Sequence, residues 1–239
     1  MKVRTLKALT GLATIFLTVL QLSNSYAHLT DAHGRQVTEP FPQPAESVEY
    51  EPPVPGSYRL PPIQRATDGK VLDSRAGSRT LFDLMAGKSA LLSFIYAKCS
   101  VPGGCPLALG ALNEVRERIL GDAGLSDKVV LITLSFDPEN DTPEVMRKLA
   151  EAFDSGESRA APPWHFLTTS SRRAIQPILE GYGQYVVREI ASSGHYTGGY
   201  SHVLKVFLID PKRRVRNIYS TSFLDPDLII ADIKTLLLE

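Results

Sequence analysis

The chain has little cysteine and no excess of charge of either sign. Only two of its 239 residues are cysteine, and 26 basic residues balance 26 acidic ones. A nucleic-acid-binding protein would carry a basic surface, so the charge balance argues against a nucleic-acid partner. After residue 27 the chain also lacks an apolar run of about 20 residues, the length that spans a bilayer.

The first 27 residues have the pattern of a secretory signal peptide. Three basic residues precede a mostly apolar run at 8–22, and Ser25 and Ala27 are small residues at the spacing that signal peptidase requires. We expect cleavage after Ala27, which leaves 23 basic and 26 acidic residues and places the protein in an oxidising compartment such as the periplasm. An uncleaved leader would instead anchor the protein in the membrane.

Composition divides the remaining chain into two parts. Residues 28–66 contain eight of the 17 prolines and show no helical or strand period, which indicates a proline-rich extended lead-in. Residues 67–239 are long enough for one domain with a sizeable core.

The second part alternates short apolar runs with amphipathic stretches. The apolar runs predict strands, and the stretches between them predict helices. The expected strands cover residues 89–97, 128–136, 165–169, 204–210 and 214–220, and the expected helices cover residues 106–120, 142–153, 171–183 and 225–239. This alternation predicts an α/β domain built on a central sheet.

Both cysteines lie in one short loop, KCSVPGGCP at residues 98–106. A disulfide that closes so small a loop removes little entropy from the unfolded chain, roughly 2.4 kcal/mol. Cys99 follows a predicted strand, and Cys105 precedes a predicted helix whose N-terminus would favour a thiolate. The pair therefore indicates a functional site more than a structural disulfide.

Five residues separate the two cysteines, whereas the redox motif C-x-x-C has two. The longer loop, with Gly103 and Gly104 as turning points, can place two soft sulfur ligands around one ion. Two thiolates with one further ligand suit Cu(I), while a closed zinc site usually has four ligands.

A third ligand would come from one of five histidines. His165 lies inside a predicted strand, where we expect a packed side chain, and His195 lies in a glycine-containing loop, where we expect a solvated one. His28 would begin the mature chain and could chelate copper with its amine, and His33 lies in the lead-in. His202 directly precedes a predicted core strand and could reach the sheet edge near Cys99, but spacing alone does not separate a ligand from a structural histidine.

Four segments together resemble the Sco/SenC family of copper chaperones. They are GKSALLSFIYAKCSVPGGCP, LSFDPENDTPEVMRKLAEAF, WHFLTTS and YSHVLKVFLIDP, and the likeness covers about residues 60–239. The resemblance implies a thioredoxin-like fold, with a central mixed sheet flanked by helices, and copper, Cu(I) or Cu(II), bound by Cys99, Cys105 and His202. It also implies a role in assembling the copper A centre of cytochrome c oxidase, with a copper-receiving client such as an oxidase subunit. Asp137 and Asp141 match the family's aspartate region, where we expect them to order the loop beside the site.

The chain departs from the family in two respects. The family's loop normally has three residues between the cysteines, and its leader usually stays as an anchor. Three alternatives to a copper chaperone remain open: a thiol–disulfide oxidoreductase that reduces client cysteines, a thiol peroxidase, and a binding module with a structural disulfide.

Overall fold

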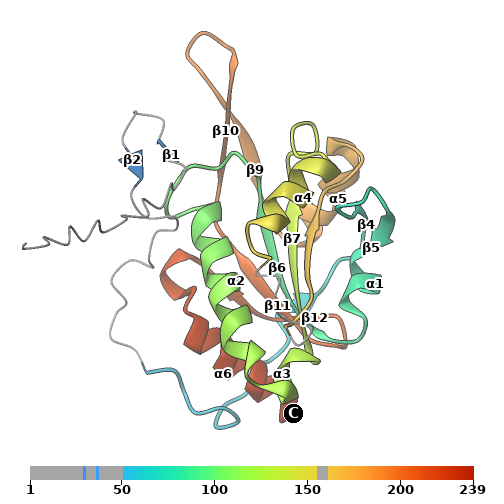
Figure 1. Ribbon diagram of the computed structural model, residues 1–239, viewed down its shortest axis with the longest axis vertical. Helices are drawn as coiled ribbons and strands as arrows, with labels where there is room; N and C mark the ends of the chain where they lie inside the picture. Colours follow the sequence, from blue (N-terminus) through green and yellow to red (C-terminus); the bar gives the residue numbers. More distant parts are fainter. Residues whose placement is uncertain (1–28, 31–35, 38–50, 155–160) are drawn as a thin grey trace, which may run out of the picture.

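A six-stranded mixed sheet forms the centre of the molecule (Figure 1). The computed structural model describes residues 29–30, 36–37, 51–154 and 161–239. The strand order is β3 (Gln64–Arg65), β12 (Arg214–Tyr219), β11 (Val206–Ile209), β6 (Ser89–Ile95), β7 (Val129–Ser135) and β8 (Trp164–Leu167). Strands β6, β7 and β8 are parallel, while β11, β12 and β3 pair antiparallel in turn.

Helices cover both faces of this sheet. On one face lie α2 (Cys105–Leu120) and α6 (Pro226–Leu237), with the short α3 (Ala123–Ser126) next to α2. On the other face lie α1 (Leu81–Met85), α4 (Pro143–Glu151) and α5 (Arg172–Gly181). The predicted α/β class with a central mixed sheet and flanking helices is therefore confirmed.

The apolar runs form the two central strands because these strands are buried on both faces. Every residue of β6 and β7 is buried. Leu91 belongs to the core under α2 and α6, whereas its neighbour Leu92 belongs to the core under α4 and α5. A strand that alternates between two cores reads as continuously apolar.

The end of the lead-in packs against the domain. The hydroxyl of Tyr58 donates to the buried carboxylate of Asp232 in α6, and the amide of Gly56 donates to Thr235. Strand β3 adds to the sheet edge beside β12. The predicted lead-in thus contributes a strand and several contacts. The boundary at residues 66 and 67 stays a prediction, and the predicted signal peptide lies outside the described residues.

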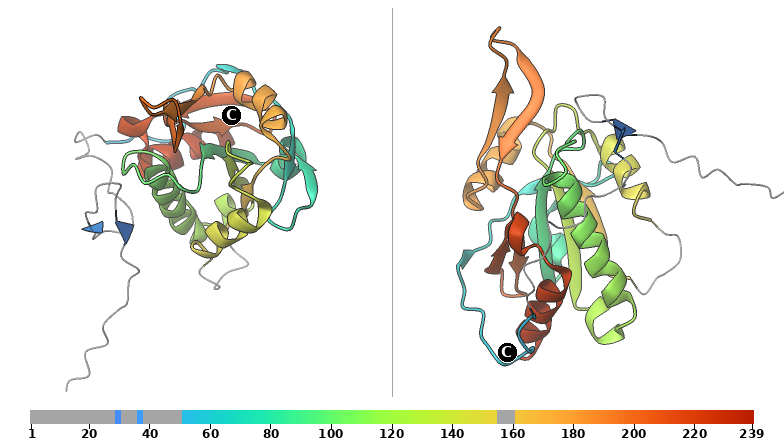
Figure 2. Two further views of the ribbon diagram at one scale, coloured as in Figure 1. Left: turned by 90° about the horizontal axis from the view of Figure 1, so that it is seen from above. Right: turned by 90° about the vertical axis from the view of Figure 1, so that its left-hand side faces the viewer.

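Three small antiparallel pairs lie outside the central sheet: β1 (Leu29–Thr30) with β2 (Gln36–Val37), β4 (Lys70–Leu72) with β5 (Ser78–Thr80), and β9 (Val186–Ile190) with β10 (Tyr196–His202). The β9–β10 hairpin projects from one end of the molecule (Figure 2). The sequence predicted only a loop around His195, because the glycines at 198 and 199 interrupt any strand pattern. A short 3₁₀ helix, η1 (Thr221–Phe223), follows β12.

Candidate functional site

The cysteine loop connects the end of β6 to the start of α2. Cys99 follows the strand by four residues, and its amide donates to the carbonyl of Tyr96 at 3.1 Å. Cys105 is the first residue of α2, after Gly104 as N-cap. A Cβ atom on Gly104 would lie 3.2 Å from the sulfur of Cys99 and 3.1 Å from the carbonyl oxygen of Val101. Glycine at 104 therefore lets the loop fold closely around the first thiol.

The two thiols have opposite acid–base tendencies. The pKa of Cys99 is held well below its usual range, because the Cys105 thiol donates to its sulfur, with further support from His202 and from the amides of Cys105 and Val101. The pKa of Cys105 is raised, because its proton is held by the Cys99 thiolate and because the side chain is buried. The sequence predicted that the helix N-terminus would favour a thiolate at Cys105. In the structure the pKa of Cys105 is raised and that of Cys99 is lowered, so the favoured thiolate is Cys99.

His202 reaches this pair from the β9–β10 hairpin. It is the last residue of β10, and its Nε2 lies 3.9 Å from the sulfur of Cys105. Its ring packs against Phe136 with a centroid distance of 4.9 Å and against Tyr96 at 6.5 Å. The structure thus brings Cys99, Cys105 and His202 together from three different elements.

Asp141 stabilises the backbone that leads into the cysteine loop. Its buried carboxylate accepts hydrogen bonds from the amide of Ala97 at 2.9 Å and from the hydroxyl of Ser135. Burial raises the pKa of Asp141, with these hydrogen bonds acting against it. Asp137 is also buried, and it accepts from the side chain of Asn140 at 2.8 Å. Such contacts can order the loop beside the site, which is the role that the resemblance implies for both aspartates.

Aromatic side chains enclose the histidine side of the site. Tyr200 lies 5.1 Å from Tyr96 and 5.3 Å from Phe136, measured between ring centroids, and all three side chains are buried. These three residues were not predicted to belong to the site. Tyr96 and Phe136 directly follow the two central strands. That position in the sequence could have indicated that they lie beside the site.

A hollow of about 330 Å³ opens beside Cys99 and His202. Val101 and Val203 line this hollow and are exposed. Three further exposed apolar side chains lie on neighbouring segments: Tyr185 just before β9, Val187 in β9, and Phe223 in η1. We call these five residues the apolar rim. The exposed fractions of Val101, Val203 and Phe223 are 58%, 64% and 66%. Large apolar side chains this exposed, on segments that contribute to one hollow, are typical of an interaction surface.

The other histidines lie elsewhere. His165 is half-buried in β8, where burial lowers its pKa, and His195 is exposed and contacts Ser193 at 3.3 Å. Neither lines the hollow beside Cys99. His28 and His33 are outside the described residues.

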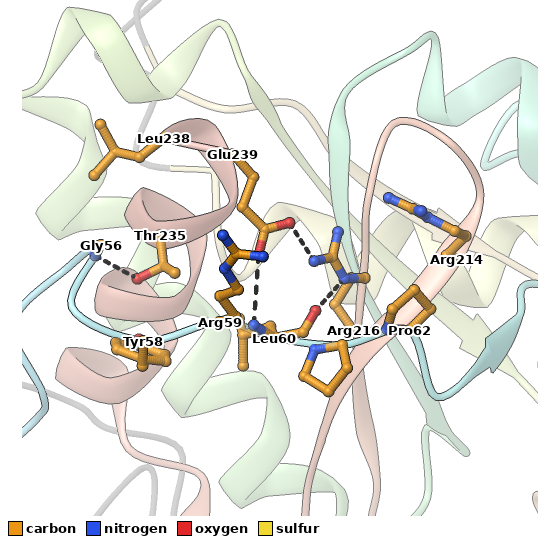
Figure 3. A pocket seen from close by; sticks show the side chains of 11 residues that line it. Gly56, Tyr58, Arg59, Leu60, Pro62, Arg214, Arg216, Thr235, Leu238 and Glu239 are labelled. Carbon is orange, nitrogen blue, oxygen red and sulfur yellow. Dashed lines mark hydrogen bonds and ion pairs between the residues drawn. The ribbon is translucent and has the colours of Figure 1, made fainter.

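A larger hollow, of about 640 Å³, lies between the lead-in and α6 (Figure 3). Its buried Arg216 pairs with Asp210 and with Glu239, and also donates to the carbonyl of Leu60. Its lining contains no thiol and no imidazole. The hydrogen bonds drawn in Figure 3 join the lead-in to the C-terminal helix and strand. This hollow therefore lies where segments of the chain pack against one another.

The donors at the cysteine site suit a soft metal ion. Two sulfurs and one imidazole are ligands typical of Cu(I), whereas Mg²⁺ and Ca²⁺ prefer oxygen. Sulfur and nitrogen ligands of one tetrahedral ion lie about 3.5 Å apart, close to the observed separation of Cys105 and His202. Within the described ranges no three histidine, cysteine or acidic side chains already form a closed metal site. Binding to all three side chains would therefore need a change in their positions. Both cysteines are free thiols in this structure.

No helix among the described residues is both long and apolar enough to cross a membrane.

Comparison with known proteins gives consistent results. The family model SCO1/SenC matches residues 71–238. The SCO1 protein homolog of Bacillus subtilis is 22% identical over 179 residues, which are 73% of this chain and 84% of that protein. Copper-bound ScoI of Bradyrhizobium japonicum has 27% identity and a TM-score of 0.56, covering 71% of this chain and 98% of that one.

A structure of BsSco, in which a disulfide switch was identified, has 21% identity and a TM-score of 0.55, covering 75% of this chain and 98% of that one. BsSco is described as a member of the Sco family of cytochrome c oxidase assembly proteins. These neighbours confirm the predicted thioredoxin-like fold. Because the family model spans more than half of the sequence, this chain belongs to the SCO1/SenC family.

Proposed function

We propose that this protein is an exported copper-binding chaperone that carries copper on Cys99, Cys105 and His202. The observation that carries the proposal is the convergence of two thiols and one imidazole from the loop after β6, the start of α2 and the end of β10, with Cys99 and His202 lining an open hollow and Cys105 buried beside His202. The copper bound to a Sco relative of 27% identity supports it. Here copper is the cargo of the protein, and its client is a copper-receiving protein such as a cytochrome c oxidase subunit.

The residues of this chain have distinct roles in the proposed site. Cys99 offers a thiolate that is ready to bind, and Cys105 gives up its proton when copper arrives. His202 supplies nitrogen, which Cu(II) prefers more strongly than Cu(I) does. The apolar rim gives a client a surface on which to dock, so that its own ligands can approach the carried ion.

Reduction of client cysteines is the second candidate function. A low-pKa thiol beside a second, protonated thiol is the arrangement that disulfide exchange uses, and Cys99 is the more accessible of the two. The disulfide switch of BsSco favours keeping this candidate. In this chain Cys99 would attack, and Cys105 would resolve the mixed disulfide.

Anaerobic copper titration of the reduced protein tests the proposal. We expect one copper per chain after dialysis, and loss of tight binding in Cys99→Ser and in Cys105→Ser. His202→Ala should weaken Cu(II) binding more than Cu(I) binding. Full copper retention in either cysteine variant would contradict the ligand set and direct attention to His28.

Export is tested separately. The intact mass of the secreted protein should correspond to a chain that begins at His28. A full-length protein found only in the membrane fraction would show that residues 8–22 anchor it.

A further inference from the structure

The hairpin that carries His202 has no backbone hydrogen bonds to the central sheet. Strands β9 and β10 form a separate two-stranded sheet. At the base, the side chain of Gln184 donates to the carbonyl of Val203 at 3.0 Å, and Lys205 donates to the carbonyl of Gly183 at 2.8 Å. These contacts hold the base of the hairpin, directly after His202. Above the base, side-chain contacts hold the hairpin against the main body.

Arg188 makes one of these contacts, beside the buried ring of Tyr200, which packs against Tyr96 and Phe136. Arg188 pairs with Tyr200 across the hairpin, lies on the same face as His202, and stacks over the ring of Tyr196 at 4.7 Å. Its guanidinium also forms an ion pair with Glu139, 49 positions away in the chain. Glu139 lies in the loop between β7 and α4, so this ion pair connects the hairpin to the main body.

The loop that holds Glu139 is also bonded to the cysteine loop. Two residues after Glu139, the carboxylate of Asp141 accepts the amide hydrogen of Ala97, which lies two residues before Cys99. The hairpin and the cysteine loop are therefore fixed to the same short segment, residues 137–141. Phe136, directly before that segment, contacts the ring of His202. A displacement of the hairpin from this segment would move the imidazole relative to both thiols.

We propose that the Arg188–Glu139 ion pair is a latch that positions His202 over the two cysteines. Glu139 is then a positioning residue of the metal site, although it offers no ligand itself. The inference rests on the proposed function, because it assigns the latch a role in copper binding. An open latch leaves both thiols in place and withdraws only the nitrogen ligand.

Glu139→Gln tests the latch with little change in shape, because it removes the charge and keeps the size of the side chain. The matched control is Glu144→Gln, which removes the exposed ion pair with Lys148 in the neighbouring helix α4. Exposed pairs of this kind contribute little to global stability, so both variants should fold with nearly unchanged melting temperatures.

The first measurement uses the copper-free protein. Glu139→Gln should increase amide hydrogen exchange in β9 and β10, whereas Glu144→Gln should leave the hairpin unchanged. The second measurement is Cu(II) affinity by competition with a chelator. Glu139→Gln should weaken binding about two- to five-fold, the range expected from one exposed ion pair. Glu144→Gln should leave the affinity unchanged.

A double-mutant cycle separates positioning from general loosening. In a His202→Ala background, Glu139→Gln should have no further effect on Cu(II) affinity, because the ligand that it positions is already gone. The latch would be contradicted if Glu139→Gln weakened Cu(II) binding equally in both backgrounds, or if it left amide hydrogen exchange in the hairpin unchanged. Neither result would contradict the proposed copper ligands. If His202→Ala itself leaves Cu(II) affinity unchanged, the ligand set of the proposed function fails, and the positioning role fails with it.

Discussion

Cys99 and Cys105 have the same type of side chain but differ in protonation. The loop surrounds the Cys99 sulfur with hydrogen-bond donors, whereas Cys105 donates its proton and is buried. The Cys99 sulfur accepts from the Cys105 thiol and from two backbone amides. Cys105 is 2% exposed and donates its own proton. The more accessible sulfur is therefore the thiolate, which suits a site that must accept a metal ion or attack a disulfide.

This difference predicts the pH dependence of alkylation in the reduced, copper-free protein. A lowered pKa keeps Cys99 ionised below the range in which ordinary thiols lose their charge. Its reaction with iodoacetamide should therefore continue with little loss from pH 8 to pH 6, while Cys105 stays unreactive. Mass spectrometry of the modified peptides gives both rates.

Two substitutions at position 105 provide the control. Cys105→Ala removes the donor, so the pKa of Cys99 should rise and its rate at pH 6 should fall several-fold. Cys105→Ser keeps a donor and should show a smaller fall. Equal rates at pH 6 in the wild type and in Cys105→Ala would contradict the hydrogen-bond explanation.

Sequence reasoning found the three proposed ligands but not their surroundings. Cys99 and Cys105 were evident because they are the only cysteines in the chain, and His202 was selected by resemblance. Tyr200 and Arg188 were missed because their role depends on the hairpin, whose pairing brings together residues that no local pattern connects. The raised pKa of Cys105 comes from its hydrogen bond to Cys99 and from its burial, and both depend on tertiary packing that has no sequence signature.

At the scale of elements, the cysteine loop combines a helix start with a tight turn. The amide of Gly104 donates to the carbonyl of Val101 at 2.9 Å, and the amide of Val101 contributes to the environment of the Cys99 sulfur. Val101, in the longer part of this loop, therefore acts on the thiol itself. Its effect is both geometric and electrostatic.

Deletion of Val101 and Pro102 should restore the three-residue spacing and change the site. We expect copper affinity or disulfide reduction potential to change by at least a few-fold, because a donor to Cys99 is lost and the two sulfurs are held differently. Copper competition and a glutathione redox titration measure the two quantities, and circular dichroism checks the fold. Unchanged affinity and potential would identify the extra residues as a neutral extension.

The predicted strands and helices of the central domain were largely correct, for a physical reason. Strands β6 and β7 are buried on both faces and are therefore continuously apolar, and α4 begins at Thr142 and Pro143, where its cap predicts it. The β9–β10 hairpin was not predicted, because Val187 and Ile190 are exposed and Gly198 and Gly199 weaken the strand pattern. Of the hairpin strands only Tyr200 is fully buried, so the strands show too weak a burial period to be recognised in the sequence.

At the scale of the molecule, the lead-in and α6 close the sheet edge far from the thiols. Figure 1 places the C-terminus at the opposite end from the hairpin. There Asp232, 1% exposed, accepts hydrogen bonds from Tyr58, Asn217 and Tyr219. This buried carboxylate connects the lead-in to a strand and to a helix.

Tyr58→Phe should lower the free energy of unfolding by about 1 kcal/mol, because it removes one hydrogen bond to a buried charge. The melting temperature should fall by about 2–4 °C, and copper binding should not change. Tyr185→Phe is the matched control, since that side chain is 80% exposed and its hydroxyl faces solvent. Equal stability of the two variants would show that the Tyr58 contact does not help to hold the lead-in on the domain.

If the protein delivers copper to a client, as proposed, the apolar rim predicts how the two proteins meet. Its five members carry no charge, so docking on the rim should depend on apolar burial and respond weakly to salt, unlike encounters steered by charge. Val203→Asp and Phe223→Ser should slow copper transfer to the copper A domain of the host's oxidase at least several-fold. Transfer to a small chelator, which needs no docking surface, should keep its rate.

Stopped-flow transfer assays at about 0.05 and 0.5 M salt provide the measurement, and the copper content of each variant before mixing provides the control. Val54→Asp is the matched substitution, because Val54 is 72% exposed but lies in the lead-in, outside the rim. If the rim variants slow transfer to the chelator as strongly as transfer to the protein, the substitutions act on the copper site itself. The rim would then have no part in docking, and a strong salt dependence would instead point to charged groups outside it.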